Sequence, residues 1–154
     1  MSSQPATAAA PQTSFPTTLP PEAAAFARQF FDAARRGDVD AFRAPLEAGL
    51  PPNLTNDKGD TLVMLASYYG HAELVSLLIQ HGADPNRIND RGQSPLAGAV
   101  FKNELAVIQA LLDGGADPLA GTPSGYDTAK MFGKLELWGE KFDKAKGKGS
   151  ASSE

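Results

Sequence analysis

Histidine and cysteine, the residue types that most often carry catalysis or bind metals, are scarce in this sequence. The 154 residues include two histidines, His71 and His81, and no cysteine. Without cysteine the chain has no disulfide, no thiolate nucleophile and no cysteine-ligated zinc. The two histidines fall on different predicted elements with no acidic residue at ligand spacing, so they do not predict a metal site. His81 precedes Gly82 at a predicted helix end, where a cation suits the helix dipole.

The hydroxyl and carboxyl groups that could act in catalysis have structural explanations. Thr61, Ser94 and Thr128 fall at predicted helix starts, where a side-chain oxygen accepts from free backbone amides, and Ser124 is a further candidate N-cap. No histidine lies at a predictable distance to activate any of them. Asp84 and Asp117 precede prolines, and backbone hydrogen bonding in turns explains aspartate there. We therefore expect no catalytic residue, no metal and no cofactor, and we predict that the protein is not an enzyme.

Composition limits the classes of partner. The net charge is −4 and the pI is about 5.1, whereas a protein that binds duplex nucleic acid normally carries a basic field. No apolar run approaches the ~18 residues of a membrane span. The first residues lack the basic start and apolar middle of a secretory signal. We expect a cytoplasmic protein that binds neither nucleic acid nor membrane.

The two ends of the chain differ in composition from the rest. Residues 1–19 are rich in alanine, proline and threonine, contain no lysine or arginine, and predict a disordered arm. Residues 144–154 are polar and interrupted by glycine, which predicts a second disordered tail. The arm could instead be a linear recognition segment, and the lysines of the tail could contact an acidic partner.

Between these ends the sequence repeats itself every 33 residues. Three residue types keep this interval in phase, which means that one supersecondary unit is copied along the chain: Gly49, Gly82 and Gly115; Ala33, Ala66 and Ala99; and Pro52, Pro85 and Pro118. A stack of copied units has no central pocket where catalytic groups would converge, and it presents a long exposed surface instead.

Each copy predicts a glycine turn, a short helix, a tight turn, a second helix and a glycine stop. Ala66 must be small because neighbouring units pack closely there, and a larger side chain would cost ~1–3 kcal/mol. Gly70 is expected to end the first helix with positive φ, and Asn103 occupies the equivalent place in the next copy. Apolar residues spaced for one helical face predict the buried side of the second helix: Leu74, Val75, Leu78 and Ile79, and in the next copy Val107, Ile108, Leu111 and Leu112.

These copies resemble the ankyrin repeat over roughly residues 22–143. The marks are a Gly-x-Thr/Ser opening, the Tyr69-Gly70-His71 turn and the Leu-Leu-x-x-Gly-Ala-Asp-Pro run. The amino-acid sequence of these copies is similar to that of small stand-alone ankyrin proteins of microbes. The resemblance implies an all-α ankyrin-repeat solenoid of helix-turn-helix units with projecting β-turn loops. It places an ankyrin domain at 20–143, with two full repeats at 55–87 and 88–120 between degenerate caps at 22–54 and 121–143.

Several positions depart from the family pattern. Pro45 replaces an interior leucine and predicts a kinked or shortened helix. Three residues are missing before Ala129, which predicts a shorter last loop, and Trp138 and Phe142 are expected to cover the final apolar face. Thr-Pro-Leu-His is absent from both copies, so the histidine that usually links adjacent units is missing. A histidine is common at the position of His71 in the family, which implies that this residue stabilises the turn.

The resemblance also implies the function. Ankyrin proteins bind other proteins in a concave groove formed by the loop tips and the exposed side of the first helices, so we expect a monomer that binds a protein partner. The alternative is a dedicated accessory subunit or inhibitor of one enzyme. The charged residues at these positions could instead be ordinary solvent-exposed residues without a binding role. Tyr68 and Phe101 could simply stack on each other. Carried onto this sequence, the groove positions are Arg35, Arg36, Asp57, Lys58, Asp60, Tyr68, Tyr69, Asp90, Arg91, Gln93, Phe101 and Lys102.

Overall fold

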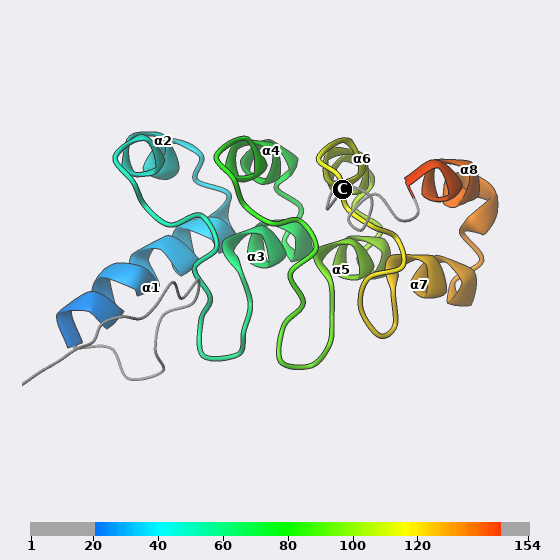
Figure 1. Ribbon diagram of the computed structural model, residues 1–154, viewed down its shortest axis with the longest axis horizontal. Helices are drawn as coiled ribbons and strands as arrows, with labels where there is room; N and C mark the ends of the chain where they lie inside the picture. The colour runs from blue at the N-terminus through cyan, green and yellow to red at the C-terminus, as the bar shows by residue number, and fades with distance from the viewer. Residues whose placement is uncertain (1–20, 146–154) are drawn as a thin grey trace, which may run out of the picture.

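The computed structural model of the protein describes residues 21–145 as a curved stack of helix pairs (Figure 1). The predicted arm at 1–19 and residues 146–154 of the predicted tail lie outside this part. The expected all-α class is confirmed, because the described residues form eight helices and no strand. In chain order these are α1 Pro21–Arg36, α2 Asp40–Glu47, α3 Leu62–Tyr68, α4 Ala72–Gln80, α5 Pro95–Phe101, α6 Leu105–Asp113, α7 Gly125–Met131 and α8 Leu135–Ala145.

The helices form two rows, and each predicted unit contains one helix of each row. The inner row is α1, α3, α5 and α7, and the outer row is α2, α4, α6 and α8 (Figure 1). Successive inner helices contact one another along the whole stack. The loops that enter α3, α5 and α7 project beyond the inner row as fingers (Figure 1).

Small residues allow the inner helices to pack closely. Ala33, Ala66 and Ala99 are buried in the core between α1, α3 and α5, as the repeat predicts. Ala129 is buried at the equivalent place in α7, which lies three residues early in the repeat. A bulkier side chain at any of these positions would separate neighbouring helices.

The helix ends follow the predicted chemistry, with one correction. The hydroxyls of Thr61 and Ser94 accept hydrogen bonds from the amides of Met64 and Ala97, so both residues are N-caps. The expectation that Thr128 caps a helix start is wrong. Ser124, also predicted as an N-cap, caps α7 in a capping box with Asp127. Thr128 lies within the helix, where its hydroxyl donates to the Ser124 carbonyl over 2.8 Å.

The turn between the two helices of a repeat has left-handed backbone, as predicted. Gly70 has a φ of 86° and Asn103, its equivalent, has a φ of 59°. Asparagine tolerates this conformation better than most residues with a side chain, which explains its presence in place of glycine.

Helix α2 contains Pro45 and does not end there. Helix α2 continues through Pro45 to Glu47, at the position equivalent to the end of α4 at Gln80. It has eight residues where α4 and α6 have nine, and the missing residue is at its start. The helix is therefore shorter by one residue, and it does not end at the proline.

The C-terminal unit differs from the others in two ways. Its finger is shorter, because residues 114–124 connect α6 to α7 while 14 residues connect α4 to α5, at 81–94. Helix α8 covers the end of the stack with Trp138 and Phe142, whose buried rings stack 6.4 Å apart. The helix also includes Lys144 and Ala145, so the predicted start of the tail at 144 is two residues early. Burial of Ala145 explains the extension.

Amide side chains connect each loop to the next one. Asn53 accepts from the amide of Asp84, and Asn86 accepts from the amide of Asp117, each over 2.7 Å. The two aspartates accept in turn from backbone amides two residues further along, which confirms their predicted role in the turns. These bonds join loops one repeat apart and hold the stack in register.

Candidate functional site

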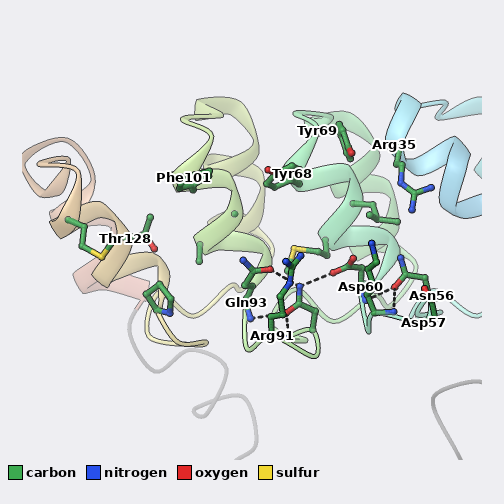
Figure 2. A pocket seen from close by; sticks show the side chains of 18 of the residues that line it. Arg35, Asn56, Asp57, Asp60, Tyr68, Tyr69, Arg91, Gln93, Phe101 and Thr128 are labelled. Carbon is green, nitrogen blue, oxygen red and sulfur yellow. Dashed lines mark hydrogen bonds between the residues drawn. The ribbon is translucent and has the colours of Figure 1, made fainter. Parts of the chain in front are cut away.

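An open groove of about 620 Å³ runs along the inner helices and the fingers. Figure 2 shows the side chains around it: aromatic rings lie toward one end of the inner helices, and polar residues of the fingers lie at the other. Its floor includes Met64, Ala97 and Gly98 of α3 and α5. The wall on the fingers is lined by Asn56, Asp57, Lys58, Asp60, Asn89, Arg91 and Gln93.

The aromatic wall consists of rings at the ends of the inner helices. Tyr68 and Tyr69 end α3, Phe101 ends α5, and Met131 and Phe132 end α7. Their side chains are largely open to solvent, at 38%, 50%, 58%, 66% and 48% exposure respectively. Apolar residues exposed singly are ordinary, but five beside one groove form a patch of the kind that marks a binding surface.

Asn89 organises the finger wall. Its carbonyl oxygen accepts from the amides of Arg91 and Gln93, and its amide nitrogen donates to the carboxylate of Asp60 over 2.8 Å and to Gln93 Oε1 over 2.9 Å. The two fingers are also joined by the Asp90 amide, which donates to the Lys58 carbonyl over 3.1 Å. Because Asn89 is buried and fully bonded, this wall has one defined shape.

Cations lie on both walls of the groove and on its border. Arg35 lies at the end of α1 with its guanidinium 2.8 Å from the carboxylate of Asp32. Lys58 and Arg91 are exposed on the two finger tips. The ammonium of Lys102 lies 4.9 Å from the centre of the Tyr68 ring, within the range of a cation–π contact.

Nine of the twelve residues carried over from the family line this groove, and three do not. The nine are Arg35, Asp57, Lys58, Asp60, Tyr68, Tyr69, Arg91, Gln93 and Phe101. Of the other three, Lys102 borders the groove through Tyr68, and Arg36 points to Asp38, whose carboxylate is 3.5 Å away. Asp90 lies at the finger tip, packed over Gly59.

Tyr68 and Phe101 each pair with another ring. Tyr68 meets Tyr69 edge-on with ring centres 5.4 Å apart, and Phe101 meets Phe132 in the same way at 5.7 Å. The sequence reasoning missed Phe132 and Met131. Both can be recognised as groove positions when the alignment allows for the three missing residues. Met131 then aligns with Phe101, and Phe132 aligns with Lys102.

His71 has a structural role on the edge of the stack. Its Nε2 lies 2.7 Å from the carbonyl oxygen of Arg35, which can only accept, so this nitrogen carries the proton. The ring thereby satisfies a free carbonyl at the end of α1 and joins the first two units. It also packs against Gly37, where a side chain would collide with it.

Neither a metal-binding cluster nor a membrane span is visible in residues 21–145. No group of three histidine, aspartate or glutamate side chains in this range could hold a metal ion. No helix in the same range is both long enough and apolar enough to cross a bilayer.

Comparison with known proteins defines the class. A family model of ankyrin repeats, in three copies, matches residues 30–121, which is more than half of the chain. The protein belongs to the ankyrin repeat family, whose members generally mediate protein–protein interaction and are typically not enzymes.

One relative is an ankyrin repeat protein of Pseudomonas aeruginosa. The two chains are 56% identical over 52 residues, which is 34% of this chain. The matched segment spans 30% of the length of that relative.

Proposed function

We propose that this protein is a non-catalytic binding module that holds a protein partner in the groove. The observation that carries the proposal is the aromatic wall, where four rings and one methionine are exposed beside a hollow. Aromatic side chains are enriched among the residues that dominate binding energy at protein interfaces. Burial of each ring by a partner would remove a large apolar area from water.

The two walls suit complementary parts of such an interface. The aromatic wall offers apolar contact, while Asp57, Lys58 and Arg91 on the finger tips offer polar groups of both signs. An apolar centre bordered by polar residues is the usual anatomy of a protein–protein interface. The bonded fingers keep their shape before binding, which lowers the entropic cost of association. On this basis we propose a monomer that binds one partner.

The test removes the rings at the centre of the aromatic wall. The variant Tyr68→Ala with Phe101→Ala should capture at least tenfold less partner, because loss of a central aromatic side chain commonly costs about 2 kcal/mol or more. Both rings are exposed, so thermal unfolding should stay cooperative. Captured protein from a native lysate is measured by quantitative mass spectrometry on the immobilised full-length chain.

A matched control removes two exposed side chains elsewhere. Leu105 in α6 and Leu137 in α8 are as exposed as the aromatic pair and do not line the groove. The variant Leu105→Ala with Leu137→Ala should capture the partner as the unmodified protein does. Equal capture by the aromatic variant, or equal loss in both variants, would contradict the proposal.

A further inference from the structure

Eight equivalent positions at the ends of the inner helices share a chemical pattern. The first series is Arg35, Tyr68, Phe101 and Met131, and the second is Arg36, Tyr69, Lys102 and Phe132. Every member is cationic or large and apolar, and none is a carboxylate. These eight positions hold three cations and no acidic residue. This is unexpected because acidic residues outnumber basic ones in the whole chain, 18 to 14.

These cations differ in how far they are already neutralised. Arg35 and Arg36 have carboxylates of Asp32 and Asp38 at 2.8 and 3.5 Å. Both bridges are exposed, so each contributes little and can be exchanged for a partner's carboxylate. Lys102 meets the face of Tyr68 and forms no salt bridge within 4 Å in residues 21–145.

The finger wall adds two cations, and one of its two acids is already engaged. Lys58 and Arg91 occupy equivalent places on the two fingers. Of the two carboxylates that line this wall, Asp60 accepts a hydrogen bond from Asn89, while Asp57 is exposed at the tip. The residues that line the groove therefore include three cations, Arg35, Lys58 and Arg91, and two carboxylates, Asp57 and Asp60. On its border Arg36 and Lys102 add two cations and Asp90 adds one carboxylate, so cations outnumber carboxylates by two beside the exposed rings, apart from Asp32 and Asp38, which bridge the two arginines.

We infer that the partner segment recognised by the groove is an extended acidic peptide that contains both carboxylates and large apolar side chains. This inference rests on the proposed function and names the chemistry of the segment. The apolar side chains would cover Tyr68, Phe101 and Phe132, and the carboxylates would meet Lys102, Arg91 and Arg35. Opposite charge at the border of an interface raises the association rate and excludes partners of the wrong sign.

The dimensions of the stack set the length of the segment. Packed helices lie about 9 Å apart, so the four inner helices span roughly 27 Å. An extended chain rises about 3.3 Å per residue, which gives a segment of roughly eight residues.

Single-stranded nucleic acid is the other ligand that combines negative charge with groups that stack on rings. It carries a phosphate at every nucleotide, and Asp57, Asp60 and Asp90 on the fingers would repel a continuous row of phosphates. A peptide can place its few carboxylates opposite the cations alone. The acid content of the fingers therefore favours the peptide.

The experiment selects peptides without presupposing their charge. A displayed library of random peptides of about ten residues is selected on the full-length protein and on the Tyr68→Ala, Phe101→Ala variant. It is also selected on Arg91→Glu with Lys102→Glu. A control of equal charge change, Arg28→Glu with Lys141→Glu, alters two exposed residues that do not line the groove.

We expect the unmodified protein and the control to enrich peptides that contain both acidic and large apolar residues. The best of these peptides, labelled and titrated by fluorescence anisotropy, should bind the Arg91→Glu, Lys102→Glu variant at least tenfold more weakly. That variant should itself enrich peptides with lysine or arginine.

The outcomes separate this inference from the proposed function. A pool that is basic or uncharged, and that is lost on the aromatic variant, overturns the acidic inference and leaves the groove as the binding face. A pool that does not differ between the unmodified protein and the aromatic variant overturns both. Tighter binding of a labelled oligothymidylate than of the best peptide, at near-physiological salt, also overturns the acidic inference.

Discussion

Replacement of Gly98 by alanine should stabilise the protein. Gly98 lies inside α5, where glycine is less favourable than alanine by roughly 0.5–1 kcal/mol. A Cβ atom there would lie 3.7 Å from Tyr68 Cδ1 and 3.9 Å from Met64 Sδ, which are ordinary contact distances. Half-burial of the new methyl adds about half of the ~0.8 kcal/mol for a fully buried methylene. The free energy of unfolding should therefore rise by about 1 kcal/mol.

Urea denaturation followed by circular dichroism measures this change, with the m-value as a check that unfolding stays two-state. Gly125→Ala is the matched comparison, because Gly125 also lies in an inner helix, but its Cβ atom would lie 2.8 Å from Leu96 Cγ. That substitution should destabilise the protein by about 1–3 kcal/mol. If Gly98→Ala lowers stability, or if both substitutions act in the same direction, the packing argument is refuted.

Three further substitutions test the contacts that hold the stack. Ser67→Ala should raise the free energy of unfolding by about 1 kcal/mol in urea denaturation, because the buried Ser67 hydroxyl has no hydrogen-bond partner and the equivalent positions in α1 and α5 hold alanine and valine. A loss of stability would contradict this. Asn89→Asp should lower the free energy of unfolding by about 1–3 kcal/mol in the same assay, because the new carboxylate would face that of Asp60. Adding Asp60→Asn should restore most of the lost stability. No recovery would refute the pairing. His71→Ala should lower the free energy of unfolding by about 1–2 kcal/mol, because the Arg35 carbonyl loses its donor. It should also speed amide hydrogen exchange in α1 more than in α5. Equal acceleration in both helices would argue against a link between the first two units.

The fold could be predicted from the sequence because its signals are local and repeated. Gly70 and Asn103 share a backbone conformation, and Thr61 and Ser94 share a capping role, so each copy supported the interpretation of the other. The prediction for Thr128 failed, whereas that for Ser124 was confirmed, because Ser124 takes the place of Ser94 once the three missing residues are allowed for. Helix α2 does not end at Pro45, because tertiary packing can outweigh local propensity.

The composition of the groove was harder to predict than its location. Tyr68 and Phe101 could be placed by alignment with the family, but Phe132 depended on the same deletion. The contacts of Asn89 could not be foreseen, because its amide joins residues of two fingers and such pairing is a matter of tertiary distance. Side chains at finger tips have no fixed periodic environment, so their partners become known only with the structure.

The links between units explain how the stack forms without the histidine that is usual in the family. Asn53, Asn86 and Asn89 each bond to the neighbouring loop, and His71 bonds to the carbonyl of Arg35. These bonds are concentrated in the loops, the fingers and the edge near α1. The exposed rings of the aromatic wall, in contrast, are held by ring contacts and a cation–π contact.

This difference gives the two walls of the groove different mechanical roles. The finger wall is fixed by hydrogen bonds that would be costly to break, so in the proposed complex it would set the position and charge pattern of the bound segment. The aromatic wall can change side-chain rotamers at little cost because its rings are exposed and form no inter-unit hydrogen bond in residues 21–145. A bound partner would then contact a rigid polar surface on the finger wall and an adaptable apolar surface on the aromatic wall. Substitutions in the fingers should change which partners bind, and substitutions of the rings should change how tightly they bind.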